Sequence, residues 1–465
     1  MNEYLNDMII QGEWVITLDK TRRMIRNGAV VINDGKIAAV GRSDDICQLY
    51  VARKTFSGKG KMVLPGMINA HVHTLEQLER GMADELPIFP WIFERTLPYE
   101  AALTPDEVYF SSLLCCAEMI RSGITTIAEV GAHPHYYHET ARAIEDAGMR
   151  AIIGKHGMDA PSAPVPGPLF ETTAEAVKSA EKLITALHGK AGGRIRGSAV
   201  VTTMRAGTSE LFQKSKRLAD ECGVVLQVHM NLGHGQFIEA MRREYGGDPI
   251  QYLDRIGVLG PNVLLVHMSY PTTPDEISIL RKQEVKICHC PGAALHGGYG
   301  VSLSKIPEFV DAGLCVGLGT DGAPSCNFND ILRTMYLAAG IHKDVRMDPG
   351  IMPPEKVLEM ATIDGARALE WEDEIGSLEV GKRADLAIFD THRPEWQPLL
   401  NPVSNLVYSA TGDSCETVII DGKVVMENGR LHTIDEDQML ERATETAREI
   451  ANRAGLHPGG IWPKE

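Results

Sequence analysis

The sequence predicts an α/β fold, a (β/α)8 TIM barrel with a small β-sandwich domain that both chain ends build together. Through the middle of the chain, short apolar runs alternate with helical stretches, as in βαβ units. At both ends, apolar and polar residues alternate with a period of two, as in antiparallel strands with one buried face. The length of 465 residues suits one barrel and a smaller unit.

The middle of the chain supplies eight candidate strands for the barrel. They cover residues 67–73, 125–131, 151–156, 195–203, 224–231, 263–268, 285–290 and 315–321. Helical patterns lie between them, at residues 105–121, 137–147, 173–187 and 210–221 among others. Eight parallel strand–helix units are the number that closes a TIM barrel. An open doubly wound sheet is the alternative, but its Gly-x-Gly-x-x-Gly fingerprint is absent after the first strand.

The two ends predict the second, all-β unit. Residues 8–18 and 28–40 alternate apolar and polar positions around a hairpin turn at Asn33-Asp34-Gly35, and residues 376–390 and 415–432 repeat this character. Residues 436–454 carry charge at helical spacing and predict an amphipathic surface helix. The predicted division is residues 1–64 and 373–432 for the sandwich, 65–372 for the barrel and 433–465 for the helical tail.

Composition excludes several classes of protein. No apolar run approaches the roughly 18 residues of a membrane span, and the N-terminus lacks the pattern of a secretory signal. The formal charge of −16 disfavours nucleic acid and anionic membranes as partners. The nine cysteines are scattered, so no disulfide framework is indicated. We therefore expect a cytoplasmic protein that acts on a small molecule.

The densest functional signal is the pair His71 and His73, at the end of the first barrel strand. Two histidines separated by one residue on a strand point the same way, so both imidazoles reach one cation. TIM-barrel active sites are built at this end of the strands. A lone His-x-His is still a weak signal, because polar loops contain many.

Three later strands each end in a single metal-competent residue, namely His229, His267 and Asp321. Any one of them is as often a structural histidine or a capping aspartate as a ligand. Their coincidence with His71 and His73 on four strands indicates a metal site. Three of these imidazoles and the carboxylate suffice for a mid-row divalent cation and leave room for water.

Several motifs resemble the amidohydrolase superfamily, in its branch of chlorohydrolases and nucleoside-type deaminases. The resemblance runs from about residue 8 to residue 432 and rests on 65–73, 123–126, 318–322, 364–369 and 376–385. It implies that His71, His73, His229 and Asp321 bind one divalent transition metal per chain. Cobalt or zinc is favoured, while manganese or iron fits the same ligands. Relatives are commonly homo-oligomers, so we expect a homo-oligomer.

The same resemblance assigns the catalytic roles. It implies that His267 sits beside the metal-bound water and the developing oxyanion, and that Asp321 also accepts the proton of the water. In the deaminases of this branch, a glutamate three residues after the fifth-strand histidine protonates the ring nitrogen of the substrate. Here Leu232 stands at that position. A missing proton donor typically removes about 10²–10⁴-fold of the rate.

A second departure is Ala293-Ala294, where family members usually carry a Ser-Asn pair. Both departures make the pocket less polar, and they resemble the molinate and phenylurea hydrolases. A carbonyl substrate needs no acid at position 232, because the metal takes the developing charge. The first hypothesis is therefore hydrolysis of an amide-like C–N bond in a small apolar thiocarbamate, carbamate or urea.

Two alternatives stay open. One is deamination of an aminopurine, aminopterin or aminotriazine. The other is a homologue without catalysis, against which the intact ligand set argues. Candidate substrate contacts, some with a surface-loop or ion-pair alternative, are Trp91, Lys155, Leu232, His234, His289 and His296.

Overall fold

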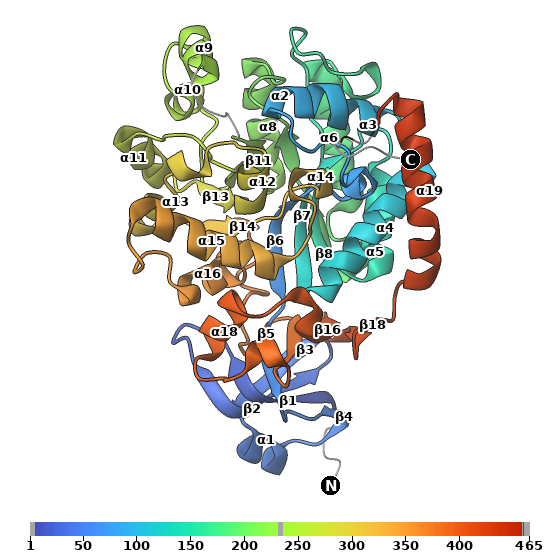
Figure 1. Ribbon diagram of the computed structural model, residues 1–465, viewed down its shortest axis with the longest axis vertical. Helices are drawn as coiled ribbons and strands as arrows, with labels where there is room; N and C mark the ends of the chain where they lie inside the picture. The colour runs from blue at the N-terminus through green and yellow to red at the C-terminus, as the bar shows by residue number, and fades with distance from the viewer. Residues whose placement is uncertain (1–4, 231–235, 458, 460–465) are drawn as a thin grey trace.

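The computed structural model describes residues 5–230, 236–457 and 459, and it has the predicted barrel (Figure 1). All eight predicted strands are present and run parallel, the fourth in two pieces. They are β6 (Met67–Val72), β7 (Ile124–Ala132), β8 (Arg150–Lys155), β9 (Ile195–Gly197) with β10 (Ala199–Val201), β11 (Leu226–His229), β12 (Val263–Val266), β13 (Lys286–His289) and β14 (Val316–Leu318). The predicted α/β barrel is thus confirmed.

At two places, hydrogen bonds outside the regular pairing of adjacent strands close the barrel. β9 pairs with β8 and β10 pairs with β11, so the fourth strand breaks at Ser198. The Ser198 N–H donates to the Ile153 carbonyl at 2.8 Å, which ties the break to β8. Between the last and first strands, the Asp321 N–H donates to the His71 carbonyl at 3.0 Å. This second bond brings two predicted metal ligands from the two ends of the barrel sequence together.

Several of the helices around the barrel begin at a threonine that caps the helix. The predicted bounds are met in α4 (Pro105–Arg121), α5 (Tyr137–Ala147) and α6 (Thr173–Leu187), and to within one residue in α8 (Ser209–Cys222). Thr104 and Thr172 each cap a helix, and a glutamate three residues later bonds back to the capping N–H. Such a capping box satisfies two backbone donors that the helix leaves open. These signals are local, which is why the sequence locates the helix ends.

Further helices complete the layer around the barrel. They are η1 (Thr74–Glu79), α2 (Ile88–Trp91), η2 (Ile92–Thr96), α3 (Leu97–Ala101), η3 (Gly167–Leu169), α7 (Lys190–Gly193), α9 (Gln236–Tyr245), α10 (Pro249–Arg255), α11 (Pro274–Lys282), α12 (Pro291–His296), η4 (Val301–Leu303), α13 (Ile306–Asp311), α14 (Ala323–Cys326), α15 (Ile331–Arg346), α16 (Pro354–Met360) and α17 (Ile363–Ala368). Of these, η1, α2, η2 and α3 follow β6 directly and carry the side chains that surround the site.

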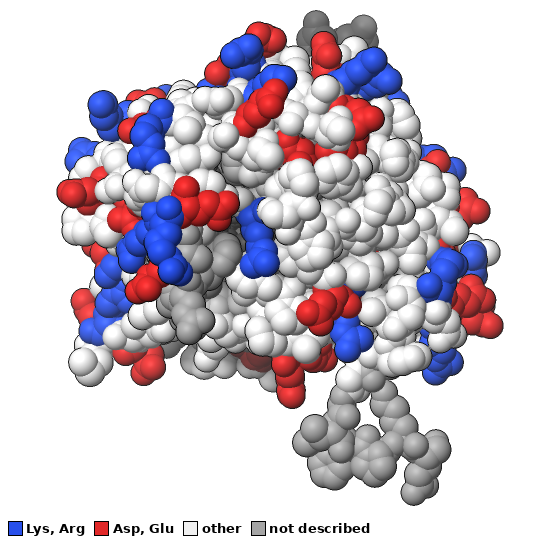
Figure 2. Space-filling model, turned by 90° about the horizontal axis from the view of Figure 1, so that it is seen from above, with Lys and Arg blue, Asp and Glu red and all other residues white. Residues whose placement is uncertain are grey.

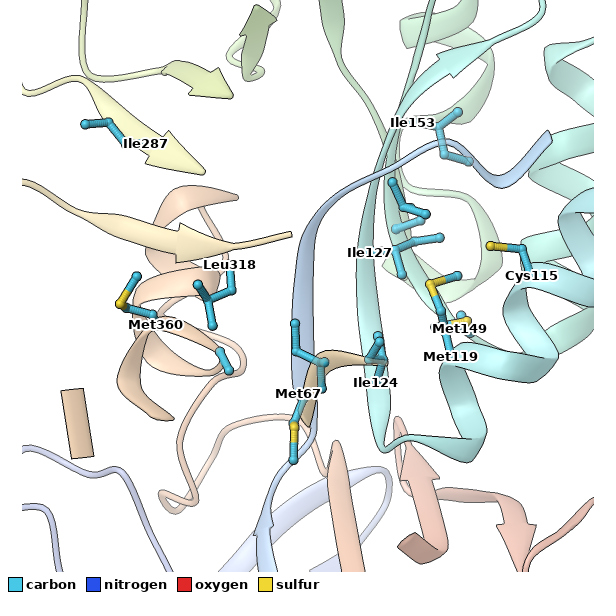
Figure 3. Close-up of a cluster of buried hydrophobic side chains, with 14 of the residues drawn as sticks. Met67, Cys115, Met119, Ile124, Ile127, Met149, Ile153, Ile287, Leu318 and Met360 are labelled. Atoms are coloured by element: carbon cyan, nitrogen blue, oxygen red, sulfur yellow. The ribbon is translucent and has the colours of Figure 1, made fainter. Parts of the chain in front are cut away.

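Apolar side chains fill the space between the barrel strands and the helices. Figure 3 shows Cys115 and Met119 of α4 facing Ile127 of β7 and Met149 before β8. All four are fully buried. Burying an aliphatic side chain of this size stabilises the fold by about 1.5–3 kcal/mol. Interlocked packing of this kind holds the strand ends in a fixed geometry.

Both chain ends join in one mixed sheet of nine strands, at the bottom of Figure 1. Its strands are β1 (Asn6–Ile16), β2 (Met24–Asn33), β3 (Lys36–Arg42), β4 (Ala52–Phe56), β5 (Lys61–Pro65), β15 (Leu386–Asp390), β16 (Cys415–Ile420), β17 (Lys423–Glu427) and β18 (Arg430–Leu431). The predicted β-rich unit of both chain ends is present, and hydrogen bonds connect all nine strands through the antiparallel β5–β15 pair. The two ends share one buried cluster that includes Val15, Val63 and Ile388.

Short helices also belong to the terminal regions. They are α1 (Ser43–Leu49), η5 (Pro394–Trp396), α18 (Pro402–Tyr408) and η6 (Gly412–Ser414). The predicted tail helix is α19 (Glu436–Ala454), which runs alongside the α3–α4 side of the barrel (Figure 1). It buries Met439, Ile450 and Ala451 against that side.

Among the described residues, no helix is long and apolar enough to cross a bilayer. Figure 2 looks down on the end of the molecule where α2 lies in Figure 1. Uncharged residues occupy much of the middle of that face, and acidic and basic side chains mingle toward its rim. The negative net charge is therefore not gathered into one acidic patch on this face.

Candidate metal centre

The carboxyl ends of four barrel strands bring the five predicted metal-site residues together. Nε2 of His73 lies 3.1 Å from Nε2 of His229. The Asp321 carboxylate lies 3.3 Å from Nε2 of His71, 3.5 Å from Nε2 of His73 and 3.8 Å from Nε2 of His267. Four imidazoles and one carboxylate therefore converge on one point.

Burial keeps these imidazoles neutral. It lowers the pKa of His71, His73 and His267 well below the usual value, and it lowers that of His229 to about 4. Neither ring nitrogen of His71 or of His267 has a hydrogen-bond partner among the described residues. Neutral imidazole nitrogens without partners, next to a carboxylate, are the donor set that a divalent transition metal takes. The residues present fit such a cation.

Two of the five residues hold an unusual backbone conformation. The φ angle is +76° at His267 and +69° at Asp321, in the left-handed region that residues with a side chain rarely adopt. Such conformations cost about 1–3 kcal/mol each and cluster at functional sites. The fold therefore imposes the positions of these two side chains.

Buried polar groups behind the cluster fix the strand ends. The Asn69 side-chain amide donates to the Thr320 hydroxyl at 2.7 Å and accepts from the Thr320 N–H at 3.0 Å, so it ties β6 to the residue before Asp321. The Glu129 carboxylate accepts the N–H groups of Thr74 and Gly131 at 2.8 and 3.1 Å. Burial raises the pKa of Glu129 to about 7. Both contacts position residues next to the predicted ligands.

A cavity opens beside the cluster. Its apolar wall comes mainly from α2 and η2, with Trp91, Ile92 and Phe93, and Leu97 and Met158 extend it. The lining also contains polar side chains that the sequence analysis did not single out. They are Glu76, Thr96, Glu100, His156, Thr202 and Thr203.

Among these polar residues, Glu76 and Glu100 are the least expected. Burial, together with the negative charge of nearby acidic groups and a hydrogen bond with Glu100, raises the pKa of Glu76 well above the usual value. The signal in the sequence was the short run Thr74 to Glu79, which places two acids directly after His73. Glu79 is also buried and accepts a hydrogen bond from the Thr96 hydroxyl at 3.2 Å.

The predicted substrate contacts divide into three groups. Trp91 lines the cavity. Leu232 and His234 lie outside the described residues. The other three, Lys155, His289 and His296, do not line it, because each is held by another partner.

These three departures have simple physical causes. Lys155 is buried, so its ammonium pairs with Glu171 and donates to the His156 carbonyl at 2.9 Å. Nε2 of His289 lies 3.3 Å from Nε2 of His342, between β13 and α15. Nδ1 of His296 lies 2.8 Å from the Ser325 carbonyl oxygen, at the end of α12.

The barrel and its cluster of imidazoles define the class of metal-dependent hydrolases, and comparison with known proteins gives the family. Residues 62–425 match the amidohydrolase family. The chain belongs to that family. It is an amidohydrolase, a hydrolase of carbon–nitrogen bonds other than peptide bonds.

Three proteins of known name are similar over almost the whole chain. A 5-methylthioadenosine/S-adenosylhomocysteine deaminase of Syntrophobacter fumaroxidans is 36% identical over 444 residues, which are 96% of this chain and 98% of the relative. The crystal structure of an adenosine deaminase from Xanthomonas campestris with bound zinc has a TM-score of 0.90 and 28% identity, and it covers 97% of this chain and 100% of its own. Atrazine chlorohydrolase from Arthrobacter aurescens, complexed with zinc, has a TM-score of 0.85 and 26% identity, with 95% and 100% covered.

These similarities change the balance between the two predicted reactions. They support metal-dependent hydrolysis, and they favour the alternative of deamination over the first hypothesis of thiocarbamate or urea hydrolysis. None of the three relatives is named for a thiocarbamate or a phenylurea.

Proposed function

We propose that the chain is a hydrolytic deaminase of an amino-substituted nitrogen heterocycle, with adenosine-type nucleosides as the first substrate class to test. The similarity to the 5-methylthioadenosine/S-adenosylhomocysteine deaminase over 96% of the chain carries this proposal. The polar side chains of the cavity agree with it, since Glu100, Thr202 and Thr203 offer partners to a hydroxylated substrate.

In this proposal His71, His73, His229 and Asp321 hold one divalent cation. When bound, the cation lowers the pKa of a water molecule toward neutrality and withdraws charge from the attacked carbon. Asp321, which lies within 3.8 Å of three imidazoles, accepts the proton of the attacking water and returns it to the leaving amine. His267 lies on the other side of the carboxylate and donates a hydrogen bond to the charge that develops during attack.

Zinc or cobalt is the proposed metal, at one tightly held equivalent per chain. The two zinc-containing neighbours support zinc. Manganese and iron fit the same donor set. We also propose a homo-oligomer, without nucleic-acid or membrane partners. Elemental analysis of the purified protein and light scattering check these two statements.

A second candidate is the hydrolysis of an amide-like C–N bond in a small apolar thiocarbamate, carbamate or urea. Leu232 favours it, because a deaminase needs a proton donor for the ring nitrogen and leucine has none. The apolar wall formed by Trp91, Phe93 and Met158 also suits an apolar substrate. Apart from Asp321, the carboxyl groups among the described lining residues belong to Glu76 and Glu100.

A substrate panel decides between the two candidates. The zinc-loaded enzyme is given adenosine, 5'-deoxyadenosine and 5-methylthioadenosine, and in parallel a thiocarbamate and two phenylureas, while ammonia and amine release are measured. The proposal expects ammonia from at least one adenosine derivative and no turnover of the ureas. Amine release from the apolar compounds, with no ammonia from the nucleosides, contradicts it and supports the second candidate.

Leu232→Glu sharpens the same test. For a deaminase, the added carboxyl group leaves nucleoside turnover intact or raises it. For an enzyme of apolar carbonyl compounds, an unpaired carboxyl group in an apolar pocket weakens substrate binding by roughly 1–3 kcal/mol. Leu232→Gln is the matched control, because it adds similar bulk without an acid.

A further inference from the structure

His156, directly after β8, joins two other residues that line the cavity. Its ring is buried, with 2% of the residue exposed. Nε2 lies 2.8 Å from Oε2 of Glu100 on α3, and Nδ1 lies 3.2 Å from the hydroxyl oxygen of Thr202, directly after β10. All three residues line the cavity. One imidazole therefore connects α3 to the end of the fourth barrel strand.

Each ring nitrogen of His156 has a protein partner, which distinguishes this ring from the imidazoles of the metal centre. Neither nitrogen of His71 or of His267 has such a partner among the described residues. The His156 ring lies nearly parallel to the ring of His73, with 6.3 Å between the ring centroids and 20° between the planes. Because both nitrogens are taken, His156 holds other side chains and leaves no nitrogen for a cation.

The Thr202 end of this link is fixed by the backbone. The Gly157 N–H donates to the Thr202 hydroxyl at 3.0 Å, and the Thr202 N–H donates to the Gly157 carbonyl at 3.1 Å. A Cβ atom added at Gly157 would lie 2.3 Å from the carbonyl oxygen of Val200, so the glycine is what lets these two strand ends come so close. The His156 ring is therefore anchored to the barrel through Thr202.

The Glu100 end depends on this anchor, because Glu100 does not come from a barrel strand. It lies on α3, a helix of five residues, and its carboxyl group is also hydrogen-bonded to Glu76 of η1. Both acids belong to the segment that follows β6. Among the hydrogen bonds of the described residues, the one with His156 ties this carboxyl group to a different barrel strand.

We propose that His156 is a positioning residue for substrate binding. It holds the Glu100 carboxyl group where that group meets a hydroxyl group of the nucleoside, and so favours hydroxylated substrates over analogues that lack the hydroxyl. A hydrogen bond weakens steeply when its donor and acceptor are misaligned, so a carboxyl group without a fixed position discriminates poorly. This inference rests on the proposed function, in which Glu100 contacts the substrate, and it adds the residue that makes the contact selective.

Two amide variants separate the two contacts of His156. Glutamine places its amide near the position of Nε2 and asparagine near that of Nδ1, so His156→Gln keeps the contact with Glu100 and His156→Asn keeps the contact with Thr202. We expect His156→Asn to raise KM for adenosine about tenfold, the cost of one buried hydrogen bond, with kcat and zinc content unchanged. His156→Gln should recover most of this loss.

Selectivity is the measurement that a merely structural role would not move. The zinc-loaded enzyme is given adenosine, 5'-deoxyadenosine and 2',3'-dideoxyadenosine, and kcat/KM is measured for each. The unmodified enzyme should prefer adenosine over at least one analogue, because a site that binds a hydroxyl group rejects the compound without it. In His156→Asn this preference should shrink about tenfold for the same analogue, and in His156→Gln it should persist.

His133→Asn is the matched control. His133 is another buried histidine, directly after the neighbouring strand β7, and it is not among the described residues that line the cavity. The control should leave KM and the preference unchanged. Circular dichroism and the zinc content report whether each variant is folded.

The results separate failure of this inference from failure of the proposed function. Ammonia from none of the nucleosides with the unmodified enzyme defeats the proposed function and the inference with it. Turnover of adenosine with unchanged KM and preference in His156→Asn defeats the inference alone. So does loss of zinc in that variant, an equal effect in His133→Asn, or failure of both His156 variants to fold.

Discussion

Two pairs of buried histidines in this molecule have nearly the same geometry and different surroundings. Nε2 of His73 lies 3.1 Å from Nε2 of His229, and Nε2 of His289 lies 3.3 Å from Nε2 of His342. Burial lowers the pKa in both pairs. Contact between imidazoles and a depressed pKa are therefore not enough to indicate a metal site.

The difference lies in what surrounds each pair. The first pair has the Asp321 carboxylate within 3.5 Å of His73, and it lines the cavity. The second pair does not line the cavity, and none of the described ion pairs brings a carboxylate to it. A ligand set is recognised by convergence of unlike donors on one open point.

The largest expected effect separates the two pairs directly. His71→Ala should lose the metal and all measurable turnover, because it removes a donor from the centre of the cluster. His289→Ala should keep one equivalent of metal, because that residue pairs with His342 instead. Elemental analysis and turnover of both variants check this. Full metal content in His71→Ala would break the comparison.

The next effect concerns His267, which belongs to the cluster without being a predicted ligand. His267→Ala should keep the metal and lower kcat by about 10²–10³, the usual cost of removing one hydrogen-bond donor from the developing charge. Metal analysis is combined with kcat measured at saturating substrate. Loss of metal in this variant would make His267 a ligand, since the structure also groups it with His71 and Asp321.

A third effect concerns the pair of His289 and His342, and it is the dependence of the free energy of unfolding on pH. Burial lowers the pKa of His342 to about 4, while in the unfolded chain it titrates near 6.5. The unfolded chain then takes up a proton between these values and the folded protein does not. The free energy of unfolding is therefore highest above pH 6.5 and falls as the pH drops toward 4. For one such group the loss amounts to about 3 kcal/mol.

His342→Gln should reduce this acid sensitivity. Denaturant unfolding of the metal-free protein at pH 7 and pH 5 measures it, and the change between the two pH values is compared with that of the unmodified protein. An identical change in both proteins would show that His342 is not protonated on unfolding in this range.

The smallest effect is expected at His296. It is one-third exposed on its side chain, and its Nε2 lies 3.3 Å from the Asp84 carboxylate. Exposed ion pairs contribute about 0–1 kcal/mol, so His296→Ala should change the free energy of unfolding by less than about 1 kcal/mol. Metal content and KM should stay unchanged. A large rise in KM would restore the prediction that His296 contacts the substrate.

The sequence predicted those features that local chemistry determines. Helix ends at Thr104 and Thr172 follow from capping boxes within four residues, and the strand-end position of His71, His229 and Asp321 follows from apolar runs that stop at a polar residue. The nine-stranded sheet needed the pairing of β5 with β15, which are more than 300 residues apart. Periodicity at the two ends predicts strands of one shared unit, but it does not identify which strands pair across the two ends.

The parts of the site that the sequence did not predict depend on distant contacts. Glu100 lies on α3, and η1, α2 and η2 separate it from the end of β6 in the sequence. Its partner His156 directly follows β8. Lys155 and His156 are neighbours, yet only His156 lines the cavity, because the Lys155 ammonium is turned to Glu171. Which of two adjacent side chains faces a cavity at a strand end is decided by such a partner.

The left-handed backbone conformation at His267 and Asp321 serves the reaction but lowers the stability of the fold. Glycine or asparagine adopts this conformation at less cost, so replacing either residue recovers part of about 1–3 kcal/mol of strain. A library screened for heat resistance alone would accumulate these replacements and lose the enzyme. Selection for stability of the fold and selection for turnover therefore act in opposite directions at these two positions.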